Sequence, residues 1–212
     1  MNSTAFWYST RATGIMTLVL LTLTMILGLV TAGRAKGRNW PGFVQQELHR
    51  RLSILAVVFL ALHVLTSILD TYVHIGWLAV VVPFASPYAR FWVGVGTIAF
   101  DLMAAVFISS LLRPYLAPGT WRGIHWLAYA CWPIALVHTF GLGTDAGQVW
   151  VVALGAACVL SVGVALLWRF RSVTGPGAGA GAATGFDAPS GPRVPPPRLV
   201  SSSRVRNDRR DL

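Results

Sequence analysis

The sequence has 212 residues, of which 55% are hydrophobic and only 11% charged, and its mean hydropathy is +0.62. A soluble globular domain needs a more charged surface, so this composition excludes that class and indicates an integral membrane protein. The net charge of +10 does not indicate nucleic-acid binding, because the 17 basic residues lie between apolar stretches and in the C-terminal part. We expect one membrane domain over residues 1–171.

Five apolar stretches are long enough to cross a bilayer, which takes about 20 helical residues. They are residues 12–32, 48–72, 91–112, 121–142 and 149–168. A sixth stretch, 75–85, is too short and contains Pro83, so we expect it to be re-entrant or to lie on the membrane surface. The predicted fold class is all-α, an integral membrane bundle of about five spanning helices.

The basic residues predict how the bundle is oriented. All but Arg11 and Arg90 of the 17 Lys and Arg residues fall on one side of the predicted spans. Because the cytoplasmic side carries the excess of Lys and Arg, we expect a multi-pass protein of the cell membrane with its N-terminus outside. Residues 172–212 are rich in Gly, Ala, Pro and Arg and poor in large apolar residues, so we expect a disordered cytoplasmic tail.

Four histidines lie inside the predicted spans, where ionisable residues are costly and therefore candidates for function. His49 and His63 are 14 residues apart, roughly 21 Å of helical rise, and share nearly one face. His125 and His138 are 13 apart, roughly 20 Å, and an ideal helix would not align them well unless Pro133 bends it. Depth then pairs His49 with His125 near the cytoplasmic side, and His63 with His138 toward the outside.

Two imidazoles from facing helices are suited to the axial ligation of a haem iron, so two pairs predict two b-type haems in the bundle core. Gly14 and Gly28 on the first helix would let a ring approach closely. Arg50, Arg51 and Arg122 adjoin the inner pair, and we select Arg50 and Arg122 as cofactor-binding residues because arginine suits carboxylates such as haem propionates. The alternative is that each histidine only bonds across a helix interface and the arginines only set the topology.

The chain resembles the ferric reductase-like transmembrane domain over roughly Tyr8 to Trp168. This family includes the membrane cores of ferric reductases and NADPH oxidases and the haem-binding membrane subunit of a bacterial methionine sulfoxide reductase system. The resemblance is carried by the two histidine spacings and by two short segments, Arg11–Ala12–Thr13–Gly14 and Leu48–His49–Arg50–Arg51.

The resemblance implies an oxidoreductase component in which electrons enter on the cytoplasmic side, pass from the inner to the outer haem and leave to an extracytoplasmic acceptor. The expected electron donor is a separate flavoprotein or a membrane quinol, and a quinone is a further candidate cofactor. The sequence differs from the oxidase members in showing no flavin or NADPH domain after the last apolar stretch, so flavin is expected only on a partner protein. It also shows five spans where many relatives have six.

Two other classes of function stay open at this level. The chain could be a haem-free membrane protein, a transporter or an assembly factor, whose histidines form a proton relay or helix contacts. It could also be a membrane anchor that recruits a partner through its basic tail. Asp101, in the third span, is interpreted as a neutral acid bonded to a hydroxyl such as that of Thr97, and His74 as a solvated or interfacial residue. Cys131 and Cys158 are expected to be small core residues.

Overall fold

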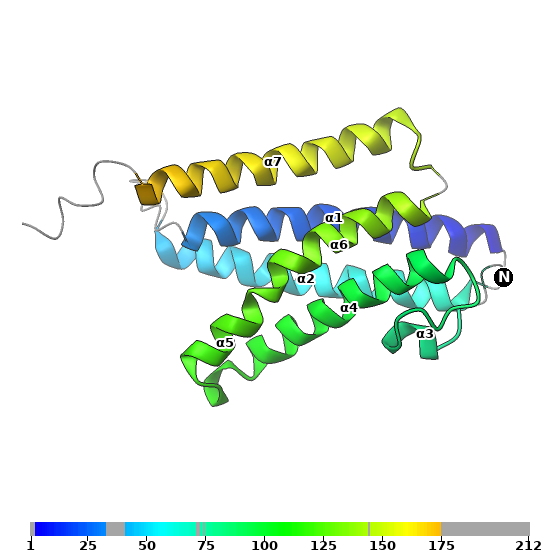
Figure 1. Cartoon of the computed structure of the whole chain (residues 1–212), viewed down its shortest axis with the longest axis horizontal. Coiled ribbons are helices and arrows are strands. Elements are labelled where there is room, and N and C mark those ends of the chain that lie inside the picture. The colour runs from blue at the N-terminus through cyan, green and yellow to red at the C-terminus, as the bar shows by residue number, and fades with distance from the viewer. Residues whose placement is uncertain (1–2, 33–40, 71–72, 74, 144, 175–212) are drawn as a thin grey trace, which may run out of the picture. The chain divides into compact units, whose positions relative to one another are not determined.

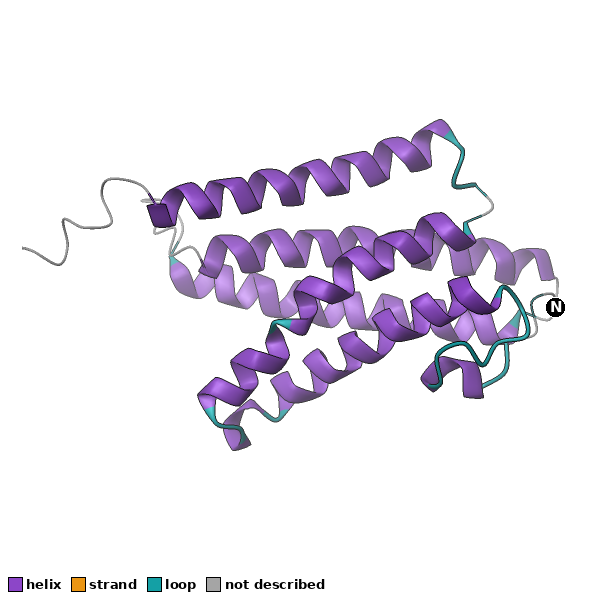
Figure 2. Ribbon diagram, in the orientation of Figure 1, coloured by secondary structure: helices purple, strands orange, loops and turns teal. Residues whose placement is uncertain are grey.

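The computed structural model describes residues 3–32, 41–70, 73, 75–143 and 145–174 (Figure 1). This part of the chain is helical and contains no strand (Figure 2). The fold class predicted from the sequence is therefore confirmed. Most of the tail predicted to be disordered, from residue 175 onward, lies outside the described residues.

Four helices are long and apolar enough to cross a membrane. They are α1 (Ser3–Ala32), α2 (Gly42–Leu69), α4 (Arg90–Leu111) and α7 (Val149–Thr174). Several ends extend past the predicted ones, since α1 begins before residue 12, α2 before residue 48, and α7 continues past residue 168. Hydropathy marks only the part of a helix inside hydrocarbon, whereas backbone hydrogen bonding continues through the polar interface.

The predicted span 121–142 is not one continuous helix. It is divided between α5 (Pro118–His125) and α6 (Leu127–Leu142), which meet at Trp126. There the Trp126 amide donates to both the Arg122 and Gly123 carbonyls, and the Tyr129 amide donates to the Trp126 carbonyl, so the bonding tightens from four-residue to three-residue steps. The bend expected at Pro133 lies instead at Trp126, and Pro133 stands inside α6.

The short apolar stretch 75–85 does not cross the bundle. It forms the four-residue helix α3 (Leu78–Val81) and a turn that returns to the start of α4. The Thr97 hydroxyl of α4 donates to the Ala79 carbonyl at 2.7 Å, which fastens α3 to the side of α4. Successive long helices therefore alternate in direction, and α3 lies at the same end of the bundle as the beginning of α1 (Figure 1).

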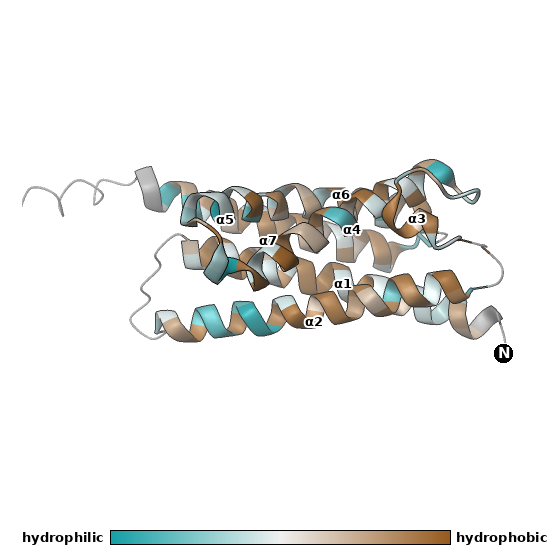
Figure 3. Cartoon of the chain, turned by 90° about the horizontal axis from the view of Figure 1, so that it is seen from below, coloured by the Kyte–Doolittle hydropathy of each residue, from teal (hydrophilic) through white to brown (hydrophobic). Residues whose placement is uncertain are grey.

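The core forms where α1 packs on α2 and α7 and where α4 packs along α6, which also contacts α1. Trp132 of α6 contacts both buried clusters and donates its indole N–H to the Thr22 hydroxyl of α1 at 2.9 Å. Cys131 and Cys158 are buried free thiols, as predicted. Apolar residues dominate the middle of the long helices (Figure 3), and many of their side chains point away from the bundle, as expected where lipid replaces water.

A 3-10 turn, η1 (Arg113–Tyr115), and two prolines connect α4 to α5. Pro114 prevents α4 from continuing, because proline has no backbone N–H to donate to the carbonyl four residues earlier. Pro118 occupies the first turn of α5, where its missing N–H would have had no helical partner. This connection brings Arg113 back over the start of α5, next to one of the histidines.

Candidate functional site

The bundle brings the four predicted histidines together as two facing pairs. His63 of α2 and His138 of α6 form the outer pair, with ring centroids 6.3 Å apart. His49 of α2 and His125 of α5 form the inner pair at the other end, with ring centroids also 6.3 Å apart. These are the partners that helix depth suggested.

The separation of the rings suits one metal ion within each pair. Two bonds between metal and imidazole nitrogen take about 2 Å each, and the two half-rings make up the remainder. Among the described residues no group of three or more His, Cys, Asp and Glu side chains could hold a metal ion. An ion between either pair would therefore need its other ligands from a bound cofactor that brings them, and two opposed imidazoles fit such a cofactor.

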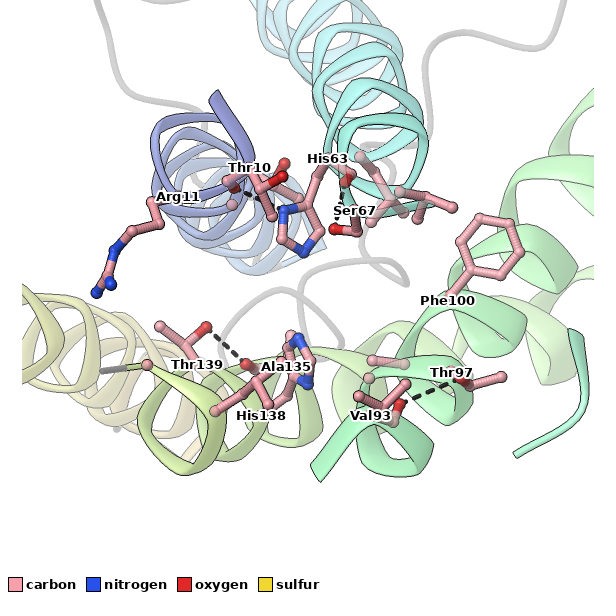
Figure 4. A pocket seen from close by; sticks show the side chains of 18 of the residues that line it. Thr10, Arg11, His63, Ser67, Val93, Thr97, Phe100, Ala135, His138 and Thr139 are labelled. Carbon is pink, nitrogen blue, oxygen red and sulfur yellow. Dashed lines mark hydrogen bonds between the residues drawn. The ribbon is translucent and has the colours of Figure 1, made fainter. Parts of the chain in front are cut away.

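Backbone carbonyls fix both imidazoles of the outer pair. The His63 Nδ1–H donates to the Thr10 carbonyl at 2.8 Å, and the His138 Nδ1–H donates to the Trp92 carbonyl at 2.8 Å. A carbonyl can only accept, so the proton belongs on Nδ1 and the Nε2 lone pair stays free for a metal. The two rings point toward each other across a cavity (Figure 4).

The inner pair is held differently. The Nδ1 atom of His125 is buried and has no hydrogen-bond partner among the described residues, whereas the His49 ring lies beside the Thr24 backbone. The His125 ring instead stacks on Trp121, with centroids 5.0 Å apart and an interplanar angle of 24°. The two pairs therefore have equal ring separations but different surroundings.

Close approach of the helices depends on small residues beneath the imidazoles. The glycines are Gly14 beneath His63, Gly28 beneath His49 and Gly96 beneath His138. A Cβ atom would lie 3.0 Å from the nearest atom of the ring at Gly14, 3.4 Å at Gly28 and 2.5 Å at Gly96. Gly14 and Gly28 were predicted to allow a close approach, and the rings that approach them are the histidines themselves.

The pairing of helices α1 and α2 repeats along its length. Gly14 and Gly28 are fourteen residues apart, the same spacing as His63 and His49. The two antiparallel helices therefore place a histidine over a glycine twice in the same register. Matching spacings on neighbouring spans were the signal that could have predicted these contacts, and the corresponding role of Gly96 was missed in the sequence.

A cavity of about 260 Å³ surrounds the outer pair and is lined mainly by apolar side chains of α1, α2, α4 and α6. Arg11 is a charged residue on its wall, and its guanidinium binds Asp145 at 2.6 Å and lies 4.5 Å from the centre of the Trp7 ring. The sequence analysis assigned Arg11 to the outer side only. The Arg11 side chain points away from the two histidine rings (Figure 4).

The arginines selected from the sequence have other contacts. Arg50 and Arg51 both bind Glu47, at 3.1 and 2.7 Å, on the exposed side of α2. Arg122 is exposed and donates to the Pro118 carbonyl within α5 at 3.2 Å. Contact of Arg50 or Arg122 with a cofactor therefore stays a prediction.

Asp101 and His74 receive no new role. The Thr97 hydroxyl donates to the Ala79 and Val93 carbonyls, so it is not available as a donor to Asp101. Asp101 is partly buried on α4. His74 lies outside the described residues.

Comparison with known protein families gives one match. The family described as ferric reductase like transmembrane component matches residues 13–136, which is more than half of the chain and contains three of the four histidines. No curated protein and no solved structure matches the chain.

Proposed function

Because the chain belongs to the ferric reductase-like transmembrane family, we propose that it is a di-haem b-type membrane cytochrome. In this proposal it relays electrons across the membrane from a cytoplasmic donor or quinol to an extracytoplasmic acceptor. The observation that carries the proposal is the presence of two facing imidazole pairs, each with ring centroids 6.3 Å apart, at two depths of one helix bundle.

The residues present fit haem better than a metal ion bound by protein ligands alone. His63 and His138 would hold the outer haem, and His49 and His125 the inner one, each pair supplying both axial nitrogens. Haem brings its own four equatorial nitrogens, which accounts for the lack of a third protein ligand among the described residues. When bound, the haems would supply a one-electron carrier at each of the two depths.

The chain's own residues orient the ligands and set their surroundings. The Thr10 and Trp92 carbonyls fix the tautomer and the ring direction of the outer imidazoles, as second-shell partners commonly do for metal-bound histidine. The wall of the outer cavity is mainly apolar. Arg11 also lies on that wall, but its guanidinium is already paired with Asp145.

The direction and the partners belong to the proposal as well. The positive-inside rule supports a cytoplasmic location for the inner pair, because the basic connections lie at that end of the bundle. The electron donor would then be a separate flavoprotein or a quinol, and the acceptor a molecule outside the membrane. A cell-membrane location with the N-terminus outside follows from the same distribution of charge.

Haem analysis of the purified full-length chain tests this function. We expect two haems per chain and the reduced spectrum of low-spin b-type haem, because both axial positions are filled by imidazole. A colourless protein purified from haem-replete cells would refute the proposal and would favour the haem-free transporter, assembly factor or anchor.

Replacement of each histidine by glutamine tests which residues hold each haem. Loss of His49 or His125 should remove one haem, loss of His63 or His138 should remove the other, and His74→Gln is the matched control that should remove neither. Insertion and helix content must be checked for each variant, because misfolding would imitate the loss of a ligand. Full haem occupancy after the loss of His63 or His138 would show that the assigned pairs are wrong.

A further inference from the structure

The inner and outer pairs differ in what holds the imidazoles. Each outer ring donates Nδ1–H to a backbone carbonyl, whereas the buried Nδ1 of His125 has no partner among the described residues. A ring without that hydrogen bond can turn about its side-chain bonds unless packing holds it. Something else must therefore determine the orientation of His125.

Trp121 stacks on His125, and Arg113 contacts Trp121 in turn. Trp121 and His125 are four residues apart on α5, so their side chains share one face of the helix. Their rings are 5.0 Å apart at 24°, an offset-stacked arrangement. On Trp121, the Arg113 guanidinium lies 4.5 Å from the ring centre, within the range of a cation–π contact.

The backbone that carries Arg113 to the Trp121 ring is conformationally restricted by its sequence. Pro114 and Pro118 restrict the connection that returns Arg113 to the start of α5. In the described part of the chain, Arg113 forms no ion pair with a carboxylate, and Glu47, at the same end of α2, is bound by Arg50 and Arg51. The guanidinium therefore remains a positive charge close to His125, although its exposure to solvent weakens the effect at a distance.

We propose that Trp121 is a positioning residue that fixes the plane of the His125 imidazole, with Arg113 held over the Trp121 ring as a nearby positive charge. This inference rests on the proposed function, in which His125 is an axial ligand of the inner haem. The stack replaces the backbone hydrogen bond that orients each outer imidazole. The positive charge of Arg113 also favours the reduced state of the inner haem over its oxidised state.

Four variants of the full-length protein separate the parts of the stack. Trp121→Leu removes the aromatic ring, and Trp121→Phe keeps a ring but loses the indole N–H. Arg113→Gln removes the charge, and Arg113→Lys keeps the charge but loses the planar group. Trp126→Leu is the matched control, because Trp126 lies five residues after Trp121 in the same segment but is 64% exposed and packs on Tyr129.

The readouts are the electron paramagnetic resonance spectrum of the oxidised protein, which reports the relative orientation of the two axial rings, and a potentiometric titration of both haems. The inner signal is identified as the one that His49→Gln removes. We expect Trp121→Leu to change the inner resonance and Trp121→Phe to restore it. Arg113→Gln should lower the inner midpoint potential, Arg113→Lys should retain it, and the outer signals should stay unchanged in all four.

An inner resonance unchanged in Trp121→Leu, or an equal change in Trp126→Leu, would overturn the positioning role. An inner midpoint potential that does not fall in Arg113→Gln would overturn the role of the charge. Because Arg113→Gln keeps the Trp121 indole, this test can still be made if Trp121→Leu fails to fold. A wild-type protein with no haem would instead refute the proposed function. The two failures are therefore distinguishable.

Discussion

Adding a single methyl group beneath His138 should weaken the binding of the outer cofactor. In Gly96→Ala the new Cβ would lie 2.5 Å from Cε1 and Nδ1 of the His138 ring, so the ring must move. Such overpacking costs about 1–3 kcal/mol. Displacement of the ring also breaks the bond from Nδ1 to the Trp92 carbonyl, worth about 1 kcal/mol.

The gain from a better helix former opposes these costs. Alanine is favoured over glycine within a helix by about 1 kcal/mol. The net cost at Gly96 is therefore about 1–3 kcal/mol, which corresponds to a loss of affinity for the outer cofactor of about 5-fold to 150-fold at 1.4 kcal/mol per factor of ten. At Gly28 the new Cβ would lie 3.4 Å from His49, an ordinary contact, so the gain in helix propensity prevails there.

The assay is a comparison of three alanine variants purified side by side. Haem content and thermal unfolding should rank them with Gly96→Ala most impaired, Gly14→Ala intermediate because its Cβ would lie 3.0 Å from His63, and Gly28→Ala equal to the parent or more stable. A Gly96→Ala protein with full haem occupancy would refute the reasoning. So would a Gly28→Ala protein that loses haem to the same extent.

Three further predictions concern other contacts of the bundle. Trp132→Phe should lose the hydrogen bond to Thr22 and lower the free energy of unfolding by about 1 kcal/mol. Adding Thr22→Val to this variant should cost little more, which a double-mutant cycle measured by denaturation would test. Asp145→Asn should lower the stability by up to about 1 kcal/mol, because its pair with Arg11 is partly exposed, and the effect should shrink at high salt. Reporter fusions should locate residues 75–89 and the C-terminus on opposite sides of the membrane; a result that places both on one side would overturn the alternation of the helices.

The sequence predicts the helices of this protein well because lipid imposes a simple length rule. It does not predict the interruption at Trp126, because the stretch 121–142 is long enough for one span and Pro133 marks a different position for a bend. The interruption comes from the backbone hydrogen bonds of Trp126, whose amide donates to the carbonyls of both Arg122 and Gly123, and hydropathy carries no information about such bonds. The outer connection was predicted not to cross, because Pro83 and its short length exclude a span.

For the candidate site, the sequence predicted which histidines form pairs, but it did not predict the contacts of the arginines. Histidine depth was enough to suggest which rings face each other, because each ring lies close to one end of its helix. Arg50 and Arg122 were selected for their closeness in sequence to His49 and His125, but the helical turn directs them to Glu47 and to the Pro118 carbonyl. Arg11 reaches the wall of the outer cavity only through helix packing, and Arg113 reaches the Trp121 ring through the proline-rich turn.

The interruption at Trp126 also reduces a mismatch of helical phase. Thirteen residues of ideal α-helix turn the chain through about 1,300°, which leaves His125 and His138 about 140° apart around the axis, whereas fourteen residues would leave about 40°. Three-residue bonding turns the chain further per residue, and it occurs between these two histidines. Inserting one alanine after Trp126 would add about 100° of helical rotation. A longer, straight helix would then present both rings to nearly the same side, as the bent helix does here.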